Sequence, residues 1–328
     1  MTERVLVTGG AGYIGSVVTA QLLEQGYQVI VYDNLSRGNR AAVPAGAELV
    51  VEDVGDRKAL DRVLGAHTVD AVMHFAAFIE AGESMREPVK YFSNNTVNSL
   101  TLLEAVLAHG VPRLVFSSSA AVYGTPERTP IAETDTLQPT NVYGESKLGV
   151  ERMLDWFHRI HGLHYASLRY FNAAGASGSR GEDHRPESHL IPLALEVALG
   201  KRDQIAIYGT DYPTTDGTCI RDYIHVDDLA RAHLRVLEAL RERDRLIYNL
   251  GNGEGFSVRE VIDTVRRVTG RPVPAREAQR RSGDPPVLVA SSDKIRRELG
   301  WSARFPELET IVRSAWEWRR AHLDGYRD

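Results

Sequence analysis

Short apolar runs alternate with amphipathic stretches through the first half of the chain. Such runs lie at residues 5–7, 29–31, 49–51, 71–73 and 114–116, and their continuous apolar character is typical of strands buried on both faces of a sheet. Between them, apolar residues recur at helical spacing, for instance over residues 17–25 and 98–109. This alternation predicts an α/β fold in which helices cover both faces of a parallel sheet.

The pattern changes after about residue 170. Residues 175–187 are mostly glycine, serine and charged residues, so we expect a loop there, and long loops in compact domains are commonly functional. Beyond it, shorter strands and helices are mixed with a return to the sheet at residues 247–250. We therefore expect residues 1–172 to form the main domain, to which later strands return. Residues 173–328 should form mainly a smaller lobe.

Composition and charge narrow the classes of function. The 328 residues are 43% hydrophobic and 25% charged, as in ordinary globular proteins, and the net charge is −5. Nucleic-acid binding needs a basic face, so we expect no nucleic-acid partner. No apolar stretch is long enough for a membrane span, and the first strand starts too early to leave room for a signal peptide. The single cysteine, Cys219, cannot form an intrachain disulfide. We expect it to be buried, and the protein to be cytoplasmic.

A glycine-rich segment joins the first strand to the first helix. It reads Thr-Gly-Gly-Ala-Gly-Tyr-Ile-Gly, and Gly9, Gly12 and Gly15 permit a tight turn, close approach of a pyrophosphate and close helix packing. The free N–H groups of the helix N-terminus attract the same anion. Asp33 ends the second strand, where a carboxylate bonds a ribose 2′-hydroxyl and repels a 2′-phosphate. The segment predicts a Rossmann-type doubly wound sheet that binds NAD rather than NADP, although Arg37 nearby keeps NADP open.

A second group of residues suggests proton transfer. Tyr143 and Lys147 are four residues apart, on one face of a predicted helix. An ammonium close to a phenol favours the phenolate and lowers the tyrosine pKa, so Tyr143 is a candidate general base. Residues 117–119 are serines directly after the predicted strand at 114–116, at the carboxyl edge of the sheet where ligands of such folds bind. A hydroxyl there, that of Ser119, can bridge a substrate oxygen and the tyrosine.

These motifs resemble those of the extended short-chain dehydrogenase/reductases. Within that group, nearly the whole chain is similar to the UDP-glucose 4-epimerase family. The matching blocks also include residues 33–34, 74–76, 82–84, 116–124, 169–172, 221–226 and 248–251. Two positions depart from the pattern. Ile79 stands where many members have a lysine, and His189 replaces an asparagine seen in some of them.

The resemblance implies a role for each matching residue. Ser119 and Tyr143 would flank the C4 oxygen of a sugar, and Lys147 would hold the nicotinamide ribose. The expected NAD contacts are Gly9, Gly12, Tyr13, Ile14, Gly15, Asp33, Asn34, Asp53, Val54, Phe75, Ala76, Ala77, Asn95 (at the pyrophosphate), Tyr143, Lys147 and Tyr170. The expected UDP-sugar contacts are Ser119, Tyr143, Asn172, His189, Leu190, Arg221, Arg281, Asp284 and Leu288. No metal site is expected. By resemblance, a homodimer should form through helices at residues 97–109 and 146–160.

The implied activity is 4-epimerisation of UDP-glucose and UDP-galactose through a transient 4-keto sugar, with tightly bound NAD. Related dehydratases and decarboxylases carry acidic residues directly after the catalytic hydroxyl, whereas here Ala120 and Ala121 follow Ser119. Epimerisation of UDP-N-acetylglucosamine or UDP-glucuronate remains an alternative, as does a non-catalytic NAD-sensing role. Leu288, counted from Gly283-Asp284, matches a position whose bulk varies with sugar preference in the family. Leucine there suggests a pocket of intermediate size.

Overall fold

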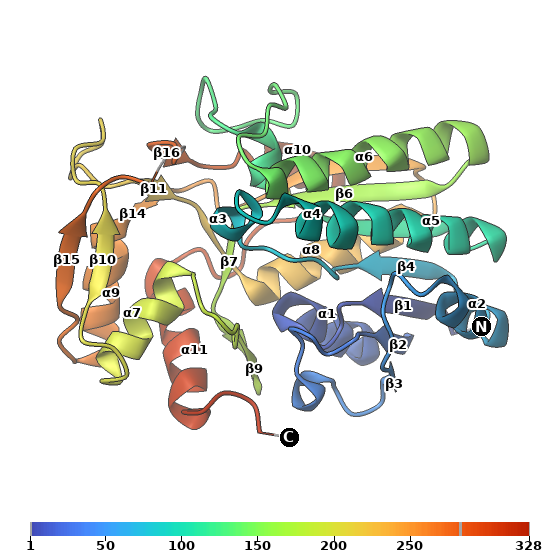
Figure 1. Ribbon diagram of the computed structural model, residues 1–328, viewed down its shortest axis with the longest axis horizontal. Coiled ribbons are helices and arrows are strands. Elements are labelled where there is room, and N and C mark those ends of the chain that lie inside the picture. Colours follow the sequence, from blue (N-terminus) through green and yellow to red (C-terminus); the bar gives the residue numbers. More distant parts are fainter. Residues whose placement is uncertain (1, 282–283, 328) are drawn as a thin grey trace.

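Seven parallel strands form the central sheet of the computed structural model, which describes residues 2–281 and 284–327 (Figure 1). Gly283, from which Leu288 was counted, lies outside the described residues. In spatial order the strands are β13 (Arg245–Leu250), β6 (His164–Tyr170), β5 (Arg113–Ser119), β4 (Ala71–His74), β1 (Arg4–Thr8), β2 (Gln28–Tyr32) and β3 (Glu48–Val50). The sheet confirms the α/β fold and the return of the chain to it at residues 247–250.

Helices cover both faces of this sheet. They are α1 (Tyr13–Glu24), α2 (Arg57–Ala66), α3 (Ala81–Ser84), α4 (Pro88–Tyr91), the π-helix η2 (Phe92–Val97), α5 (Asn98–Ala108), α6 (Val142–His161), α8 (Val226–Ala239) and α10 (Asp293–Leu299), with short 3-10 turns η1 (Arg40–Ala42) and η3 (Ala120–Tyr123). Side chains alternate between faces along a strand, so Val5 and Val7 pack with α1 and α8 while Leu6 packs with α2, α5 and α6. The continuous apolar runs of the sequence therefore fill two cores.

The order of the strands reverses between β1 and β4. β1 pairs with β2 on one side and with β4 on the other, and Thr8 and His74 are register partners at the end of the latter pair. The loops after these two strands must diverge to opposite faces, which opens a crevice at the carboxyl edge of the sheet. Any ligand of this fold is expected there.

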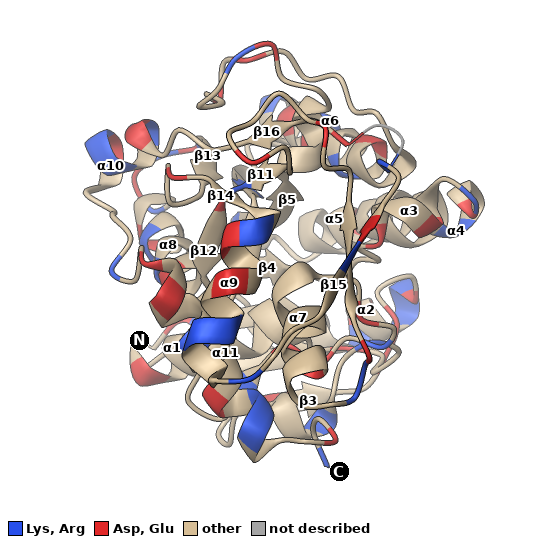
Figure 2. Ribbon diagram, turned by 90° about the vertical axis from the view of Figure 1, so that its left-hand side faces the viewer, with Lys and Arg blue, Asp and Glu red and all other residues tan. Residues whose placement is uncertain are grey.

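The smaller lobe contains the remaining elements and a core of its own (Figure 1). They are β7 (Asn172–Ala174), β8 (Ala176–Ser177), β9 (Arg180–Gly181), α7 (Leu190–Ala198), β10 (Ile205–Tyr208), β11 (Ile220–Arg221), β12 (Tyr223–His225), β14 (Phe256–Ser257), α9 (Val258–Thr269), β15 (Ala275–Ala278), β16 (Val287–Leu288) and α11 (Leu308–Ala321). Apolar residues of α7, α9 and α11 pack on β10 and Tyr223. On the face seen in Figure 2, residues of both charges are interspersed along α9 and α11.

Two expectations need correction. β5 continues through Ser119, so the serines at 117–119 are the last residues of the strand rather than a segment after it. The segment 175–187 is not a simple loop, because it contains the antiparallel pair of β8 and β9 and buries Glu182 and Asp183. Polar composition hid this burial, since these carboxylates are buried among charged and hydrogen-bonding partners. None of the helices in the described residues is long and apolar enough to cross a membrane.

Candidate active site

The glycines after β1 are required for three different reasons. Gly9 has a φ of +73°, and a Cβ there would lie 2.5 Å from the backbone nitrogen of Ala76, at the end of β4. A Cβ on Gly15 would lie 2.2 Å from the carbonyl oxygen of Gly9, so this glycine lets α1 pack on the loop. A Cβ on Gly12 would meet only that same oxygen, at 3.3 Å, and would otherwise face the cavity. Gly12 is the N-cap of α1 and provides no side-chain cap. The helix N-terminus is thus left open to an anion, as a dinucleotide pyrophosphate requires.

Asp33 lies beside this loop and is nearly buried. One carboxylate oxygen accepts a hydrogen bond from the Ala11 N–H at 3.0 Å, and the other accepts one from the Leu35 N–H at 2.8 Å. Burial raises the pKa of Asp33, and these two backbone bonds oppose the shift. Arg37 forms an ion pair with Glu80 at 3.7 Å. The carboxylate is therefore fixed in place for ribose hydroxyls, and the arginine that kept NADP open has an acidic partner.

A cavity of about 350 Å³ extends from the glycine loop across the carboxyl edge of the sheet. It is lined by every residue expected to contact NAD except Asn95, and by the expected substrate residues Ser119, Tyr143, Asn172 and His189. The glycine loop, the carboxylate expected at the ribose and the proton-transfer residues therefore line one continuous cavity. The fit of this cavity to NAD comes from the open helix N-terminus and from the fixed carboxylate of Asp33 beside it.

Asn95 has a different place from the one expected. Its side chain is buried, its oxygen accepts a bond from the Phe78 N–H, and its nitrogen donates to the Phe78 carbonyl and to the Ser146 hydroxyl. It therefore ties the loop after β4 to α6. Asn94, its neighbour in η2, lines the cavity instead. Of these two neighbours in η2, Asn94 is therefore the one that lies at the cavity.

The proton-transfer group is assembled from β5 and the first turns of α6. Ser119 ends β5, and its hydroxyl accepts a hydrogen bond from the Ala121 N–H at 3.2 Å. The Lys147 ammonium donates to the Ser117 carbonyl at 2.8 Å and lies 6.0 Å from the centre of the Tyr143 ring. Burial lowers the pKa of Lys147 to about 7. The predicted i, i+4 arrangement on one helix face is therefore correct.

The pKa of Tyr143 differs from expectation. Burial raises it above the ordinary value of 10.0; a hydrogen bond with Ser119 lowers it, and the Glu80 carboxylate raises it further. We expected the Lys147 ammonium to lower it. Burial weakens this effect, because it disfavours the charged forms of both side chains. In the protein alone the phenol is thus protonated at neutral pH, and Ser119 is the neighbour that favours its ionisation.

The other expected substrate residues are not among those that line the cavity. Arg221 forms an ion pair with Asp284 at 3.1 Å. In the parallel pair of β11 and β16, Arg221 is the register partner of Leu288. Leu288 packs in a small apolar cluster with Phe171, which lines the cavity. Arg281 lies apart from this pair, with its guanidinium 4.0 Å from the centre of the Tyr208 ring. Leu190 begins α7 and packs on the core of the smaller lobe.

His189, unlike these residues, lines the cavity, and it has close acidic neighbours. Its Nδ1 lies 2.7 Å from Glu182 and 3.0 Å from Glu187. Burial alone would lower the pKa of His189, but these two carboxylates raise it well above its ordinary value. The predicted phosphate contact of His189 therefore concerns a cationic imidazole.

Several residues that line the cavity escaped sequence reasoning, among them Glu80, Asn94, Phe171, Glu182 and His184. The sequence gives no separate signal for Glu80 or Phe171, which reach the cavity only through packing. The mixture of glutamates and histidines at residues 182–189 is a visible signal, but the polar composition of residues 175–187 predicts only a loop.

Fold and site together define the class. An open glycine loop at the switch point of a parallel sheet, with serine, tyrosine and lysine at the same edge, is the arrangement of a short-chain dehydrogenase/reductase. Known proteins narrow this class. Residues 5–251 match the NAD dependent epimerase/dehydratase family.

The UDP-glucose 4-epimerase of Halalkalibacterium halodurans is 53% identical over 98% of this chain and 97% of its own length. That of Streptomyces lividans is also 53% identical, over 100% and 99% respectively. The UDP-glucose 4-epimerase of Brucella ovis in complex with NAD superimposes with a TM-score of 0.94, at 45% identity over 96% of this chain and 98% of that one. The chain therefore belongs to the NAD dependent epimerase/dehydratase family. It is an NAD-dependent isomerase, which confirms the expected family, fold and cofactor.

Proposed function

We propose that the chain interconverts UDP-glucose and UDP-galactose by inverting the configuration at C4 of the sugar. The observation that carries this proposal is the continuous cavity that runs from the glycine loop past Ser119, Tyr143 and Lys147 to Asn172 and His189. The relatives named above are UDP-glucose 4-epimerases, and the chain matches them over nearly their full length. Residues 1–172 would mainly hold NAD, and residues 173–328 would mainly hold the UDP-sugar.

The proposed chemistry assigns proton transfer to Tyr143. The glycine loop, Asp33 and Lys147 would hold NAD, and the bound cofactor would supply hydride transfer from and to C4 of the sugar. The positive charge of its oxidised form would favour the phenolate of Tyr143. Tyr143, as phenolate, takes the proton of the 4-hydroxyl, while the Ser119 hydroxyl bonds the same oxygen. After the 4-keto sugar has turned over within the cavity, Tyr143 returns the proton from its phenol oxygen. Lys147 orients this pair from the floor of the site, where its ammonium is already bonded to Ser117.

Elimination of water needs an acid–base group that this site lacks beside the reacting hydroxyl. Ala120 and Ala121 follow Ser119 in the turn η3, and neither can carry a proton. This favours epimerisation over the dehydratase and decarboxylase reactions of related enzymes. A role as a non-catalytic NAD sensor is disfavoured because Ser119, Tyr143 and Lys147 all line the cavity.

Product analysis tests the substrate and the fate of NAD together. The protein is incubated separately with UDP-glucose, UDP-N-acetylglucosamine and UDP-glucuronate, and each product is separated and identified. We expect UDP-galactose from the first substrate, weak conversion of the second and no net NADH. Preferred conversion of UDP-N-acetylglucosamine or UDP-glucuronate would establish one of the alternative epimerases. NADH that accumulates in proportion to product would indicate a dehydrogenase instead.

We also propose a homodimer built on the outer faces of α4, η2, α5 and α6. Large apolar side chains are exposed there: Val89, Phe92, Val97, Leu100, Trp156 and Ile160. These side chains lie on helices that contact one another, and exposed apolar side chains on neighbouring helices are typical of an interface. The expected mass in light scattering is that of two chains, and Trp156→Lys should reduce it to one. A wild-type protein that remains monomeric at micromolar concentration would refute this proposal.

We further propose that the protein is cytoplasmic. Cys219 is a free, buried thiol, and free thiols persist in reducing compartments. Fractionation of cells that express the native protein should recover it with the cytosolic fraction, and recovery from an extracellular fraction would refute the proposal.

A further inference from the structure

Two glutamates and two histidines of one short segment converge at the wall of the cavity. They are Glu182, His184, Glu187 and His189, and one potential ligand atom from each lies within 4.8 Å of those from the others. Three of them also line the cavity. They are two, three and two residues apart in an irregular segment directly before α7.

The contacts among them leave more acceptors than donors. His189 Nδ1 faces Glu182 Oε1 at 2.7 Å and Glu187 Oε1 at 3.0 Å, and His184 Nδ1 faces the same Glu182 oxygen at 3.0 Å. One imidazole nitrogen carries at most one proton, so it can donate a full hydrogen bond to only one of two carboxylates. Glu187 Oε1 also accepts hydrogen bonds from the N–H groups of Ser188 at 2.7 Å and His189 at 2.8 Å. Two carboxylates and two imidazoles whose potential ligand atoms lie within 4.8 Å of one another are nevertheless a set of groups that can bind a cation.

The charge balance points the same way. The side chains of Glu182 and Glu187 are each only 7% exposed. Within residues 2–281 and 284–327, the ion pairs of these two carboxylates are with imidazoles, and no lysine or arginine forms one with either. Buried carboxylates without a full counter-charge are unfavourable. One divalent cation would neutralise both carboxylates and leave both imidazoles neutral.

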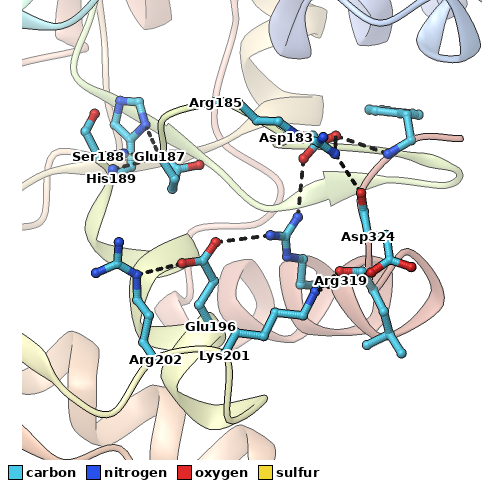
Figure 3. Close-up of polar contacts among 12 residues, drawn as sticks. Asp183, Arg185, Glu187, Ser188, His189, Glu196, Lys201, Arg202, Arg319 and Asp324 are labelled. Carbon is cyan, nitrogen blue, oxygen red and sulfur yellow. Dashed lines mark hydrogen bonds and ion pairs between the residues drawn. The ribbon is translucent and has the colours of Figure 1, made fainter.

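The segment is held in place by residues that do not belong to this group. Asp183 lies between Glu182 and His184 in the chain, but it binds Arg319 of α11 at 3.5 Å and Arg185 at 3.4 Å (Figure 3). Its carboxylate also accepts a hydrogen bond from the Tyr326 N–H at 3.1 Å. Arg319 also binds Glu196 of α7 at 3.2 Å. The C-terminal helix and α7 therefore fix the backbone of the segment from outside the group. Such support lowers the ordering cost of binding an ion.

We propose that Glu182, His184, Glu187 and His189 form a binding site for one zinc ion. Two imidazole nitrogens and two carboxylate oxygens are a donor set that zinc accepts in tetrahedral geometry. Zinc–ligand bonds of about 2.0–2.2 Å place the donor atoms about 3.3 Å apart. The close contacts of 2.7 and 3.0 Å would therefore widen, and any pair now farther apart, within the limit of 4.8 Å, would close. With four protein ligands the site is closed, which makes its role structural: it pins the cavity wall to the start of α7.

This site is compatible with the substrate role proposed for His189. The contacts use Nδ1, so a bond to a phosphate would come from Nε2. A metal on Nδ1 would then fix the ring orientation for that bond. The expectation of no metal, drawn from the sequence, is replaced by this proposal, and it does not depend on which sugar is converted.

Zinc binding is measured on the full-length, NAD-saturated protein after removal of metals with a chelator. The protein is titrated with zinc chloride, and bound zinc is determined by atomic absorption after equilibrium dialysis. We expect one zinc per chain, with affinity reduced at least about 100-fold in Glu182→Gln and in His184→Gln, since loss of even an outer partner costs 10–100-fold. His161→Gln, an exposed histidine on α6, is the matched control and should bind zinc as the wild type does.

Cobalt provides a second reading of the same site. Cobalt in tetrahedral coordination absorbs strongly in the visible range, and this band should appear in the wild type and in His161→Gln but be absent from His184→Gln. His184 is 22% exposed, so this variant should fold even where Glu182→Gln does not. Zinc affinity that is equal in the wild type and both site variants, or lost equally in the control, would overturn the proposal. Neither outcome bears on the epimerase reaction, which is measured separately by product analysis.

Discussion

Substitution of two glycines in the same loop should separate folding from cofactor binding. In Gly15→Ala the new Cβ would lie 2.2 Å from the Gly9 carbonyl oxygen, against 3.4 Å for the onset of ordinary contact. Backbone must therefore move by about 1.2 Å, and overpacking of this kind costs about 3 kcal/mol or more when no flexible side chain can give way. In Gly12→Ala the new Cβ meets the same oxygen at 3.3 Å, and the φ of −81° and ψ of 176° are allowed for alanine.

Gly12→Ala should therefore fold almost normally but bind NAD poorly. Alanine is a poorer N-cap than glycine, which costs about 1 kcal/mol at most. Its methyl group would occupy the place where a pyrophosphate approaches the first N–H groups of α1. Loss of one or two charge-assisted hydrogen bonds, about 1.5–3 kcal/mol each, reduces affinity by roughly 10- to 100-fold or more.

Two measurements distinguish the variants. Thermal unfolding without NAD should show Gly12→Ala within about 3 °C of the wild type and Gly15→Ala lower by on the order of 5 °C or more. NAD released per chain on acid denaturation should be low in Gly12→Ala. It should be near the wild-type level in the control Gly65→Ala, in α2, whose Cβ would make ordinary contact at 3.6 Å. Gly12→Ala that retains NAD like the control would refute the assignment of the pyrophosphate to this helix N-terminus. Gly15→Ala with an unchanged Tm would refute the packing argument.

Three further predictions concern the reacting groups and the sugar pocket. Tyr143→Phe should reduce kcat by about 10²–10⁴-fold and leave UDP and NAD affinity unchanged in calorimetry, and a loss of less than twofold would exclude Tyr143 as the acid–base group. The pKa of Lys147 is lowered from 10.5 to about 7, so the unfolded chain binds more protons between these values. The free energy of unfolding should therefore rise with pH in this window, by at most about 1.4 kcal/mol per pH unit, and Lys147→Met should lose that rise in Tm measured without NAD from pH 7 to 10. Leu288→Tyr should selectively suppress turnover of UDP-N-acetylglucosamine and Leu288→Ser should improve it, by tens-fold in kcat/KM at about 1–3 kcal/mol per methylene-sized change. A ratio of the two sugars that does not move would show that Leu288 is core packing alone.

Most of the central sheet could be predicted because its strands are apolar on both faces. Residues such as Val5, Leu6 and Val7 can be buried only in a sheet that is covered twice, and this pattern is local in the sequence. The glycine loop was found for the same reason, since its turn, its helix N-terminus and Asp33 all lie within one short βα unit and the strand after it. The limits of the strands were predicted less well. β5 continues to Ser119, and its last three residues are polar serines, which the apolar pattern does not include.

The parts of the site that could not be predicted depend on tertiary contacts or on solvation. Asn94 and Asn95 are adjacent and chemically identical, and the sequence alone does not show which of them lies at the cavity. The direction of the Tyr143 pKa shift depends on the extent of burial, which spacing to Lys147 does not reveal. The group at residues 182–189 requires two carboxylates to be buried, and polar composition suggests the opposite.

One buried carboxylate connects the smaller lobe to the edge of the sheet. Asp222, between β11 and β12, accepts hydrogen bonds from the N–H groups of Asn252 at 2.7 Å, Gly253 at 3.1 Å and Ala290 at 3.0 Å. Its carbonyl accepts a bond from the Asn172 side chain at 2.8 Å, which places that side chain at the cavity. Burial raises the pKa of Asp222 to about 7, and the three backbone bonds oppose the shift. Asp222 directly follows Arg221, which lies opposite Leu288, and it also holds Asn172 at the cavity. A change at Asp222 should therefore alter substrate binding and the position of the smaller lobe together. The sequence motif at 221–226 thus combines a candidate ligand contact with the residue that fixes its position.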